Sequence, residues 1–172
     1  EPFVVVANIP YYITSAIIRK LLEVKKRPSR MILTIQKEVA ERIIARDGKM
    51  SLLALSVQVY GKPELVATIP ASAFYPAPDV DSAVLKLTLY DEPLIPEKHM
   101  DLFFKLATAG FSQKRKTLRN SLTGGLGIQA QDTERMLERA GIESNRRAET
   151  LSLEEWNRLV SSYIDFLRNP EN

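Results

Sequence analysis

The chain has 172 residues, of which 45% are hydrophobic and 26% are charged, a composition typical of globular proteins. It contains no cysteine and a single histidine, His99, which excludes disulfides, thiolate metal sites and multi-histidine metal sites. No apolar run is long enough to span a membrane and no signal peptide is recognisable, so we expect a cytoplasmic protein with no metal and no membrane partner.

The formal net charge of +3 is too small for a polycation, but the positive charges are clustered. One cluster lies within residues 19–30 and another within residues 114–119, where no acid is present. Such clusters can bind phosphates, whereas a cluster taken alone is more often a solvated face. The second cluster consists of Lys114, Arg115, Lys116 and Arg119.

Strands and helices alternate in the first half of the chain. Residues 3–7 are an apolar β-branched run that predicts a strand buried on both faces. A loop over residues 8–12 precedes a predicted helix from about residue 14 to residue 24. The segments that follow are, in order, a strand at 31–35, a helix at 37–45, and an ambiguous segment at 51–60 for which a helix is favoured.

Residues 65–69 and 83–89 predict two more strands, and because no helix joins them we expect an antiparallel pair at the edge of the sheet. Beyond these strands the composition changes, and every periodic segment is helical. The glycine-rich residues 124–127 predict a flexible break. Four helices are expected, at about 98–109, 116–122, 133–140 and 153–167. The pattern predicts an α/β part over residues 1–92 and a small helical domain over residues 93–172.

The tetrapeptide Asn8-Ile9-Pro10-Tyr11 follows the first predicted strand, at the end of a sheet where α/β proteins bind ligands. The Asn8 amide oxygen and the Pro10 carbonyl could accept hydrogen bonds from an exocyclic amine, and Tyr11 offers a flat face for a base. The amine of adenine is a poor nucleophile because its lone pair is delocalised, and two acceptors would draw that pair toward a methyl donor. An ordinary strand-to-helix turn, with Asn8 bonded locally and Tyr11 in the core, explains the tetrapeptide alone equally well.

The proline-rich loop of residues 74–82 carries Phe74 ahead of the last predicted strand. A proline-stiffened loop presents a side chain with little loss of entropy. An aromatic ring there could close over a flipped-out base. The alternative is that Phe74 fills the core.

Four segments resemble motifs of one enzyme family. Residues 8–11 are similar to the N-[LIP]-P-[YF] motif of amino-group methyltransferases. Residues 74–82 resemble the F-x-P-x-P-x-V-x-S element of the ribosomal RNA adenine N6,N6-dimethyltransferases. Residues 36–42 and 111–122 resemble that family's Q-K-E-V-A-x-R and F-x-x-R-R-K-x-L-x-N-x-L segments. The last segment has the form of the housekeeping small-subunit enzymes (KsgA type) and differs in the antibiotic-resistance methyltransferases of the Erm type.

The resemblance implies a partial Rossmann-like methyltransferase sheet followed by a small all-helical RNA-binding domain. It implies S-adenosylmethionine-dependent dimethylation of adenine N6 on two adjacent adenosines of small-subunit ribosomal RNA, within ribosome biogenesis. Asn8 and the Pro10 carbonyl would activate the amine, Tyr11 would stack on the base, and Phe74 would close the pocket. Asn8 would also line the donor site, and the basic cluster at 114–119 would hold the RNA backbone.

Two residues depart from the family pattern, and one family element is absent. Tyr12 stands where the family usually has Asn, and Asp79 where it often has Lys, so no RNA role is assigned to Asp79. The family's glycine-rich S-adenosylmethionine loop and ribose-binding acid precede the first motif, and neither is in this sequence. We therefore expect further sequence before Glu1, no methylation by these residues alone, and a non-native dimer through the exposed edge of the first strand.

Alternative functions use the same residues differently. A non-catalytic RNA-binding or ribosome-assembly module would use the aromatic rings only to stack on unpaired bases. The presence of Asn8 together with Tyr11 favours catalysis, because stacking does not need the amide. A DNA adenine methyltransferase shares the tetrapeptide but not the basic helix or the Phe74 element, and an Erm-type large-subunit enzyme differs in the basic segment.

Overall fold

The computed structural model describes residues 1–46 and 48–169, and the chain divides into two compact units. They are a sheet unit, Glu1–Ala45 with Leu53–Pro93, and a helical unit, Arg46–Leu52 with Leu94–Asn172. A single boundary after residue 92 was expected, whereas the short segment Arg46–Leu52 belongs to the same unit as the helices that follow. Its Met50 amide donates a hydrogen bond to the Glu149 carbonyl at 3.1 Å, which ties the segment to the helical unit.

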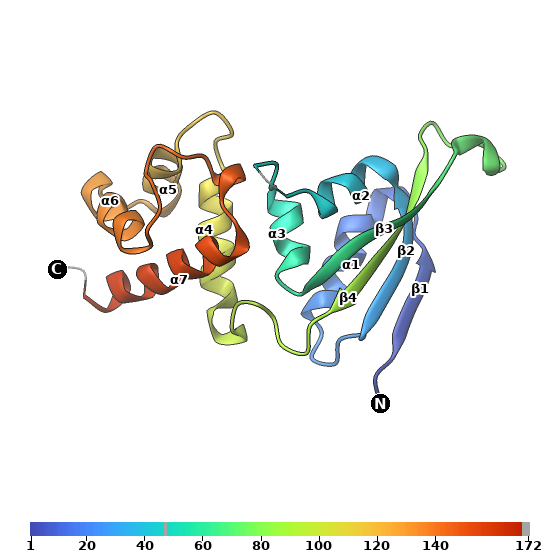
Figure 1. Cartoon of the computed structure of the whole chain (residues 1–172), viewed down its shortest axis with the longest axis horizontal. Helices are drawn as coiled ribbons and strands as arrows, with labels where there is room; N and C mark the ends of the chain where they lie inside the picture. Colours follow the sequence, from blue (N-terminus) through green and yellow to red (C-terminus); the bar gives the residue numbers. More distant parts are fainter. Residues whose placement is uncertain (47, 170–172) are drawn as a thin grey trace. The chain divides into compact units, whose positions relative to one another are not determined.

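The sheet unit contains four strands in the order β1-β2-β4-β3 (Figure 1). These are β1 (Val4–Asn8), β2 (Arg30–Gln36), β3 (Gly61–Ile69) and β4 (Ser82–Leu89). Strands β1 and β2 are parallel, and β4 is antiparallel to both β2 and β3. The expected antiparallel pair is therefore confirmed, with β3 as the edge strand.

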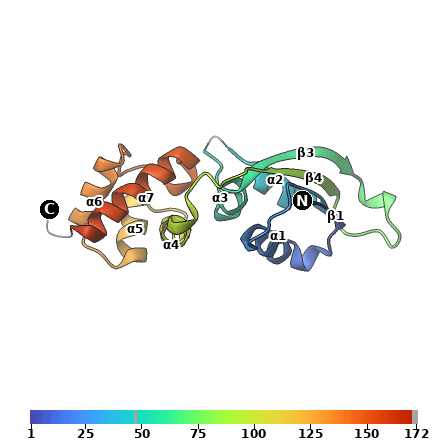
Figure 2. The same cartoon turned by 90° about the horizontal axis from the view of Figure 1, so that it is seen from below.

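Three helices lie on one side of this sheet (Figure 2): α1 (Thr14–Glu23), α2 (Lys37–Ile44) and α3 (Leu52–Gln58). The ambiguous segment at 51–60 thus contains the favoured helix. Because side chains alternate along a strand, the helix-covered face takes every second residue of β2. Met31, Leu33 and Ile35 are fully buried, and each lies opposite an equally buried residue of β4, namely Leu87, Leu85 and Ala83.

Strand β1 is not buried on both faces as expected. Val4 is 51% and Val6 is 73% exposed, whereas the alternate residues Val5 and Ala7 are half-buried beside Met31 and Leu33. The reason is its position, since β1 is an edge strand of a sheet covered by helices on one side. The expected pairing of two copies through this edge stays a prediction.

The helical unit contains the four expected helices, α4 (Met100–Phe111), α5 (Leu118–Leu126), α6 (Ala130–Arg139) and α7 (Leu153–Arg168). Their apolar faces meet in a core that includes Trp156, Tyr163 and Phe103, each no more than 2% exposed. Short 3-10 helices connect the longer elements: η1 (Tyr11–Ile13), η2 (Ala71–Ala73), η3 (Glu97–His99) and η4 (Ala148–Thr150). Among the described residues, no helix has both the length and the apolar character to cross a membrane.

The predicted flexible break at residues 124–127 is instead the end of α5. The helix continues to Leu126 and stops at Gly127, which adopts the left-handed conformation with φ of 67°. Gly125 has a separate role, because a Cβ there would lie 2.6 Å from the Ala109 Cβ of α4. The glycine therefore allows α4 and α5 to approach closely, and flexibility is not needed to explain it.

An ion pair fixes the start of α7. Ser152 and Glu155 form a capping box, in which each side chain accepts a hydrogen bond from the other residue's main-chain amide. Arg146 donates to both Glu155 carboxylate oxygens, and to the Thr150 carbonyl at 2.6 Å. The hydrogen bond from Arg146 lowers the pKa of Glu155 below its ordinary value, against an opposing effect of burial.

Candidate active site

The site expected from the sequence lies at one end of the sheet, where several strand ends meet. Asn8 is the last residue of β1 and is aligned with Thr34 near the end of β2. Gln36, the last residue of β2, is aligned with Ser82, the first residue of β4. The tetrapeptide, the start of α2 and the end of the proline-rich loop are therefore neighbours in the fold, although they are distant in sequence.

Asn8 is exposed at this end of the sheet. The next residue, Ile9, is 3% exposed, and its amide donates to the Thr34 carbonyl at 3.1 Å, so the main chain below Asn8 is held firmly. In the described part of the chain, the Asn8 amide group has no hydrogen-bond partner. The Asn8 side chain is therefore not bonded locally, as it would be in an ordinary turn. Its amide group is available to a ligand.

The Pro10 carbonyl begins the 3-10 helix η1 and already accepts one hydrogen bond, from the Ile13 amide at 3.2 Å. A carbonyl oxygen has two lone pairs, so one acceptor position remains. The proline ring restrains φ, which is −57° here, and with ψ at 132° the chain turns from β1 into η1. The Pro10 carbonyl can therefore accept a hydrogen bond from a ligand amine while it keeps its bond to the Ile13 amide.

Tyr11 is half-buried, and its hydroxyl shares a hydrogen bond of 2.5 Å with the Ser82 Oγ. Ser82 itself is fully buried. The Tyr11 carbonyl accepts a hydrogen bond from the Thr14 Oγ1 at 3.2 Å, which holds the main chain at Tyr11. The ring is thus anchored at its tip rather than enclosed in the core, and the next residue, Tyr12, is 89% exposed.

The loop that carries Phe74 is anchored at its base by Asp81. The Ala71 amide donates to the Asp81 Oδ1 at 3.0 Å, and the Lys37 amide donates to the Asp81 carbonyl at 3.0 Å. Figure 1 shows the loop projecting beyond the ends of β3 and β4. Phe74 is half-buried, so it does not fill the core, and the adjacent Tyr75 is fully exposed.

The structure brings some of the expected site residues together and leaves others apart. Tyr11 is joined to the end of the Phe74 loop through Ser82. Within the described residues no hydrogen bond or ring contact links Phe74 to Asn8 or Tyr11. No role was expected for Ser82 or Asp81 from the sequence. The signal that could have found them is their place in the family-like loop element, which ends with these two residues.

The basic cluster lies in the helical unit, and its residues differ in exposure and in their ion-pair partners. Lys114, Arg115 and Lys116 are exposed in the turn between α4 and α5, where they line a hollow of about 570 Å³ together with Gln113. Arg119 is only half-exposed, and its Nε lies 2.6 Å from the Glu134 Oε2. The turn residues are therefore free to meet an anion, whereas Arg119 already has an acidic partner.

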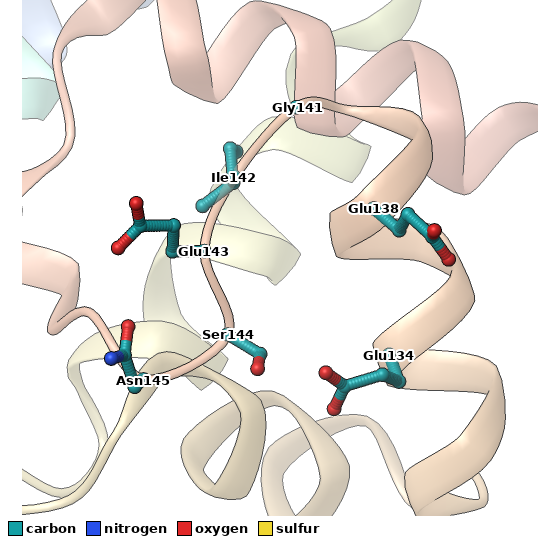
Figure 3. Close-up of a pocket in the computed structure, with 7 residues that line it drawn as sticks. All are labelled: Glu134, Glu138, Gly141, Ile142, Glu143, Ser144 and Asn145. Atoms are coloured by element: carbon teal, nitrogen blue, oxygen red, sulfur yellow. The ribbon is translucent and has the colours of Figure 1, made fainter.

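A second hollow of about 660 Å³ lies between α6 and the segment after it (Figure 3). Its acidic side chains are Glu134 and Glu138 on α6 and Glu143 on the opposite segment, with Ser144 pointing toward Glu134. Negative charge of this kind repels phosphate, so this hollow is not a candidate RNA site. No group of three His, Cys, Asp or Glu side chains in the described ranges is arranged to hold a metal ion.

A family model described as Ribosomal RNA adenine dimethylase matches residues 1–165. The chain is 49% identical over 164 residues to Ribosomal RNA small subunit methyltransferase A of Dehalococcoides mccartyi, covering 95% of this chain and 56% of that protein. It is 42% identical over 163 residues to the protein of the same name from Desulfitobacterium hafniense, covering 94% of this chain and 58% of that protein. The chain thus spans a little over half the length of these relatives.

Two solved structures are similar to the fold. A dimethyladenosine transferase from Plasmodium falciparum matches with a TM-score of 0.78 and 25% identity, over 98% of this chain and 68% of that chain. The 23S rRNA methyltransferase ErmE matches with a TM-score of 0.71 and 27% identity, over 94% of this chain and 65% of that chain. These similarities confirm the expected α/β, Rossmann-like methyltransferase fold.

Proposed function

Because the chain belongs to the ribosomal RNA adenine dimethylase family, we propose that the protein containing it methylates N6 of adenine in small-subunit ribosomal RNA. The donor is S-adenosylmethionine, and the products are two adjacent dimethylated adenosines formed in the cytoplasm during ribosome biogenesis. The choice of subunit is supported by 49% identity over 164 residues to a relative named Ribosomal RNA small subunit methyltransferase A.

The observation that carries this proposal is the pair of available acceptors at the end of β1. The Asn8 amide has no partner among the described residues, and the Pro10 carbonyl retains one lone pair. Two acceptors on the hydrogens of adenine N6 hold the amine in a fixed orientation and draw its lone pair out of conjugation with the ring. The nitrogen then becomes nucleophilic without a general base acting first on it.

The aromatic side chains near this end hold the base. Tyr11 stacks on the extruded adenine, and Phe74 closes over it from the anchored loop. Extrusion is required because N6 of a stacked and paired base is not accessible to a methyl donor. The half-buried state of both rings supports this role, since each retains surface for a ligand.

The residues present fit a donor site in part. Asn8 stands exposed at the carboxyl end of β1, where ligands bind in α/β sheets, and its unpaired amide suits a polar ligand as well as a base. When bound, S-adenosylmethionine supplies an electrophilic methyl group. Asn8 would line the side of its site that faces the adenine.

The helical unit supplies the contact with the RNA backbone. Three consecutive exposed cations line one hollow, so their charges can bind phosphates together. They are Lys114, Arg115 and Lys116. Arg119 belongs to the same proposed surface but has to leave or share Glu134 to contribute.

The test is a methyl-transfer assay with the gene product that contains this chain and with isolated, unmethylated ribosomal subunits. We expect labelled N6,N6-dimethyladenosine in small-subunit RNA and none in large-subunit RNA or DNA. Binding to small subunits without transfer would instead support the non-catalytic RNA-binding module. Transfer to large subunits would support the Erm-type alternative.

A further inference from the structure

The hydroxyl contact between Tyr11 and Ser82 joins the two motifs that the proposed function assigns to the base. Tyr11 lies in the tetrapeptide after β1, and Ser82 is the first residue of β4, directly after the loop that carries Phe74. The two oxygens are 2.5 Å apart. Ser82 is fully buried, so water does not compete for its hydroxyl.

The position of Ser82 is determined by main-chain pairing. It is aligned with Gln36 of β2 on one side and with Ile69 of β3 on the other. The preceding residue, Asp81, accepts hydrogen bonds from the amides of Ala71 and Lys37. The Ser82 hydroxyl is therefore a rigid point at the end of the sheet.

The main chain of Tyr11 is also fixed, so only its side-chain torsions remain free. The Thr14 Oγ1 donates to the Tyr11 carbonyl, and η1 is closed by the Ile13 amide on the Pro10 carbonyl. With the main chain fixed, holding the hydroxyl oxygen determines the direction of the ring axis. A phenol hydroxyl forms its hydrogen bonds close to the plane of the ring, so the direction of the Ser82 Oγ also selects the rotation of the ring about that axis. A stacking surface whose plane is set in advance loses less entropy when a base binds.

We propose that Ser82 is a positioning residue for methyl transfer: it holds the Tyr11 ring in the plane required for stacking on the extruded adenine. This inference rests on the proposed function, because it needs a base against Tyr11. Ser82 itself touches neither base nor donor. Its effect on the reaction is exerted through the Tyr11 hydroxyl.

A double-mutant cycle tests this role in the gene product that contains the chain. Ser82→Ala and Tyr11→Phe remove the same hydrogen bond from its two sides, and Tyr11→Phe retains the stacking ring. We expect each to lower kcat by about threefold to tenfold, the effect of one lost hydrogen bond, with little change in KM for the RNA. The double variant should be no slower than either single variant, because the two changes remove one interaction.

A second readout is independent of turnover. RNA that carries 2-aminopurine at the target position becomes fluorescent when the base is extruded, and stacking on an aromatic ring quenches it. Both single variants should give a brighter complex than the wild type at equal RNA occupancy. Ser72→Ala removes an exposed hydroxyl from η2, between β3 and the Phe74 loop, and serves as the control, for which no change is expected.

Several outcomes would overturn the assignment. If the fold-losses of kcat in the two single variants multiply in the double variant, Ser82 and Tyr11 act separately. If Tyr11→Phe has a normal kcat while Ser82→Ala has a lowered kcat, Ser82 only stabilises the fold. The same conclusion follows if the loss of kcat in a variant matches its loss of folded protein, measured by thermal unfolding. An inactive wild type would refute the proposed function itself, whereas an active wild type with unaffected variants would refute only this inference.

Discussion

The guanidinium group of Arg119 lies against the carboxylate of Glu134, with 2.6 Å between Nε and Oε2. Arg119 is in the first turn of α5 and Glu134 is on α6, so the pair joins two helices of the helical unit. An arginine in such a pair has less to offer a phosphate than an unpaired lysine in the same cluster. The positive charges at 114–119 should therefore contribute unequally to RNA binding.

The first prediction concerns this inequality. Replacing Lys114 and Lys116 by alanine should weaken RNA binding and reduce the slope of log affinity against log salt by at most about two units. The single variant Arg119→Ala should change this slope by less than the single variants Lys114→Ala and Lys116→Ala do. Filter binding or fluorescence anisotropy at several salt concentrations measures both quantities.

The matched control for this experiment replaces Lys98 and Arg135, which are exposed elsewhere in the helical unit. It removes the same charge and should leave the slope nearly unchanged. An equal loss of slope in the control, or an unchanged slope in the Lys114 and Lys116 variant, would show that the cluster is only a solvated face.

The second prediction concerns Asn8. Asn8→Ala in the gene product should abolish methyl transfer while RNA affinity changes little, because Asn8 is assigned to the amine and not to the backbone. Transfer and RNA affinity are measured separately, and Asn145→Ala provides a control at an exposed asparagine in the helical unit. Near-normal turnover of the Asn8 variant would remove Asn8 from the mechanism.

The third prediction concerns the contact between α4 and α5. A methyl group at Gly125 would lie 2.6 Å from the Ala109 Cβ and 2.7 Å from its Cα, so Gly125→Ala should destabilise the protein by about 1–3 kcal/mol. Gly124 precedes it in the same helix, and the nearest atom to its added Cβ is 3.8 Å away. Gly124→Ala should stabilise the helix by up to about 1 kcal/mol. Urea denaturation of both variants measures the difference, and equal effects would contradict the close approach.

The fourth prediction concerns stability in acid. Since the hydrogen bond from Arg146 lowers the pKa of Glu155 in the folded state, Glu155 binds its proton more readily when the chain unfolds. Its contribution to stability is present above the unfolded pKa and is lost as the pH falls through the lower, folded pKa. Glu155→Gln should therefore reduce stability at pH 7 and flatten the decline below about pH 4.5, the ordinary value for glutamate.

The neighbouring Glu154→Gln is the control for this prediction. The Glu154 side chain is 85% exposed and lies 3.7 Å from Arg158, so its loss should have little effect at any pH. Thermal unfolding between pH 3 and pH 7 measures both variants. Parallel pH profiles for the wild type and Glu155→Gln would disprove the role of this carboxylate.

The order and type of the elements could be predicted because hydrophobic periodicity is local. Met31, Leu33 and Ile35 alternate along β2, and the helices of the second half repeat at helical spacing. The edge position of β1 was expected from the absent family elements, but the exposure of one face at Val4 and Val6 could not be predicted from the run itself. A run of β-branched residues looks the same in a central strand and in an edge strand, and only the arrangement of the whole sheet distinguishes them.

The candidate site was predictable where its residues are adjacent in sequence. Asn8, Pro10 and Tyr11 form one tetrapeptide whose chemistry can be considered directly. Ser82 could not be connected with them, because it is 71 residues from Tyr11 and the contact exists only in the folded sheet. Gly125 was misjudged for the same reason, since its partner Ala109 lies on another helix.

The two amides held by Asp81 belong to the main chain, at Ala71 and Lys37. Such donors exist whatever side chains stand at those positions, so the loop's attachment does not depend on the residues between its ends. Exposed positions of the tip, such as Tyr75, can therefore change in sequence while β3 and β4 keep their register. Insertions or substitutions in this projecting loop should therefore be tolerated by the sheet, which makes the loop a place where a label or a new binding segment can be introduced without disturbing the strands.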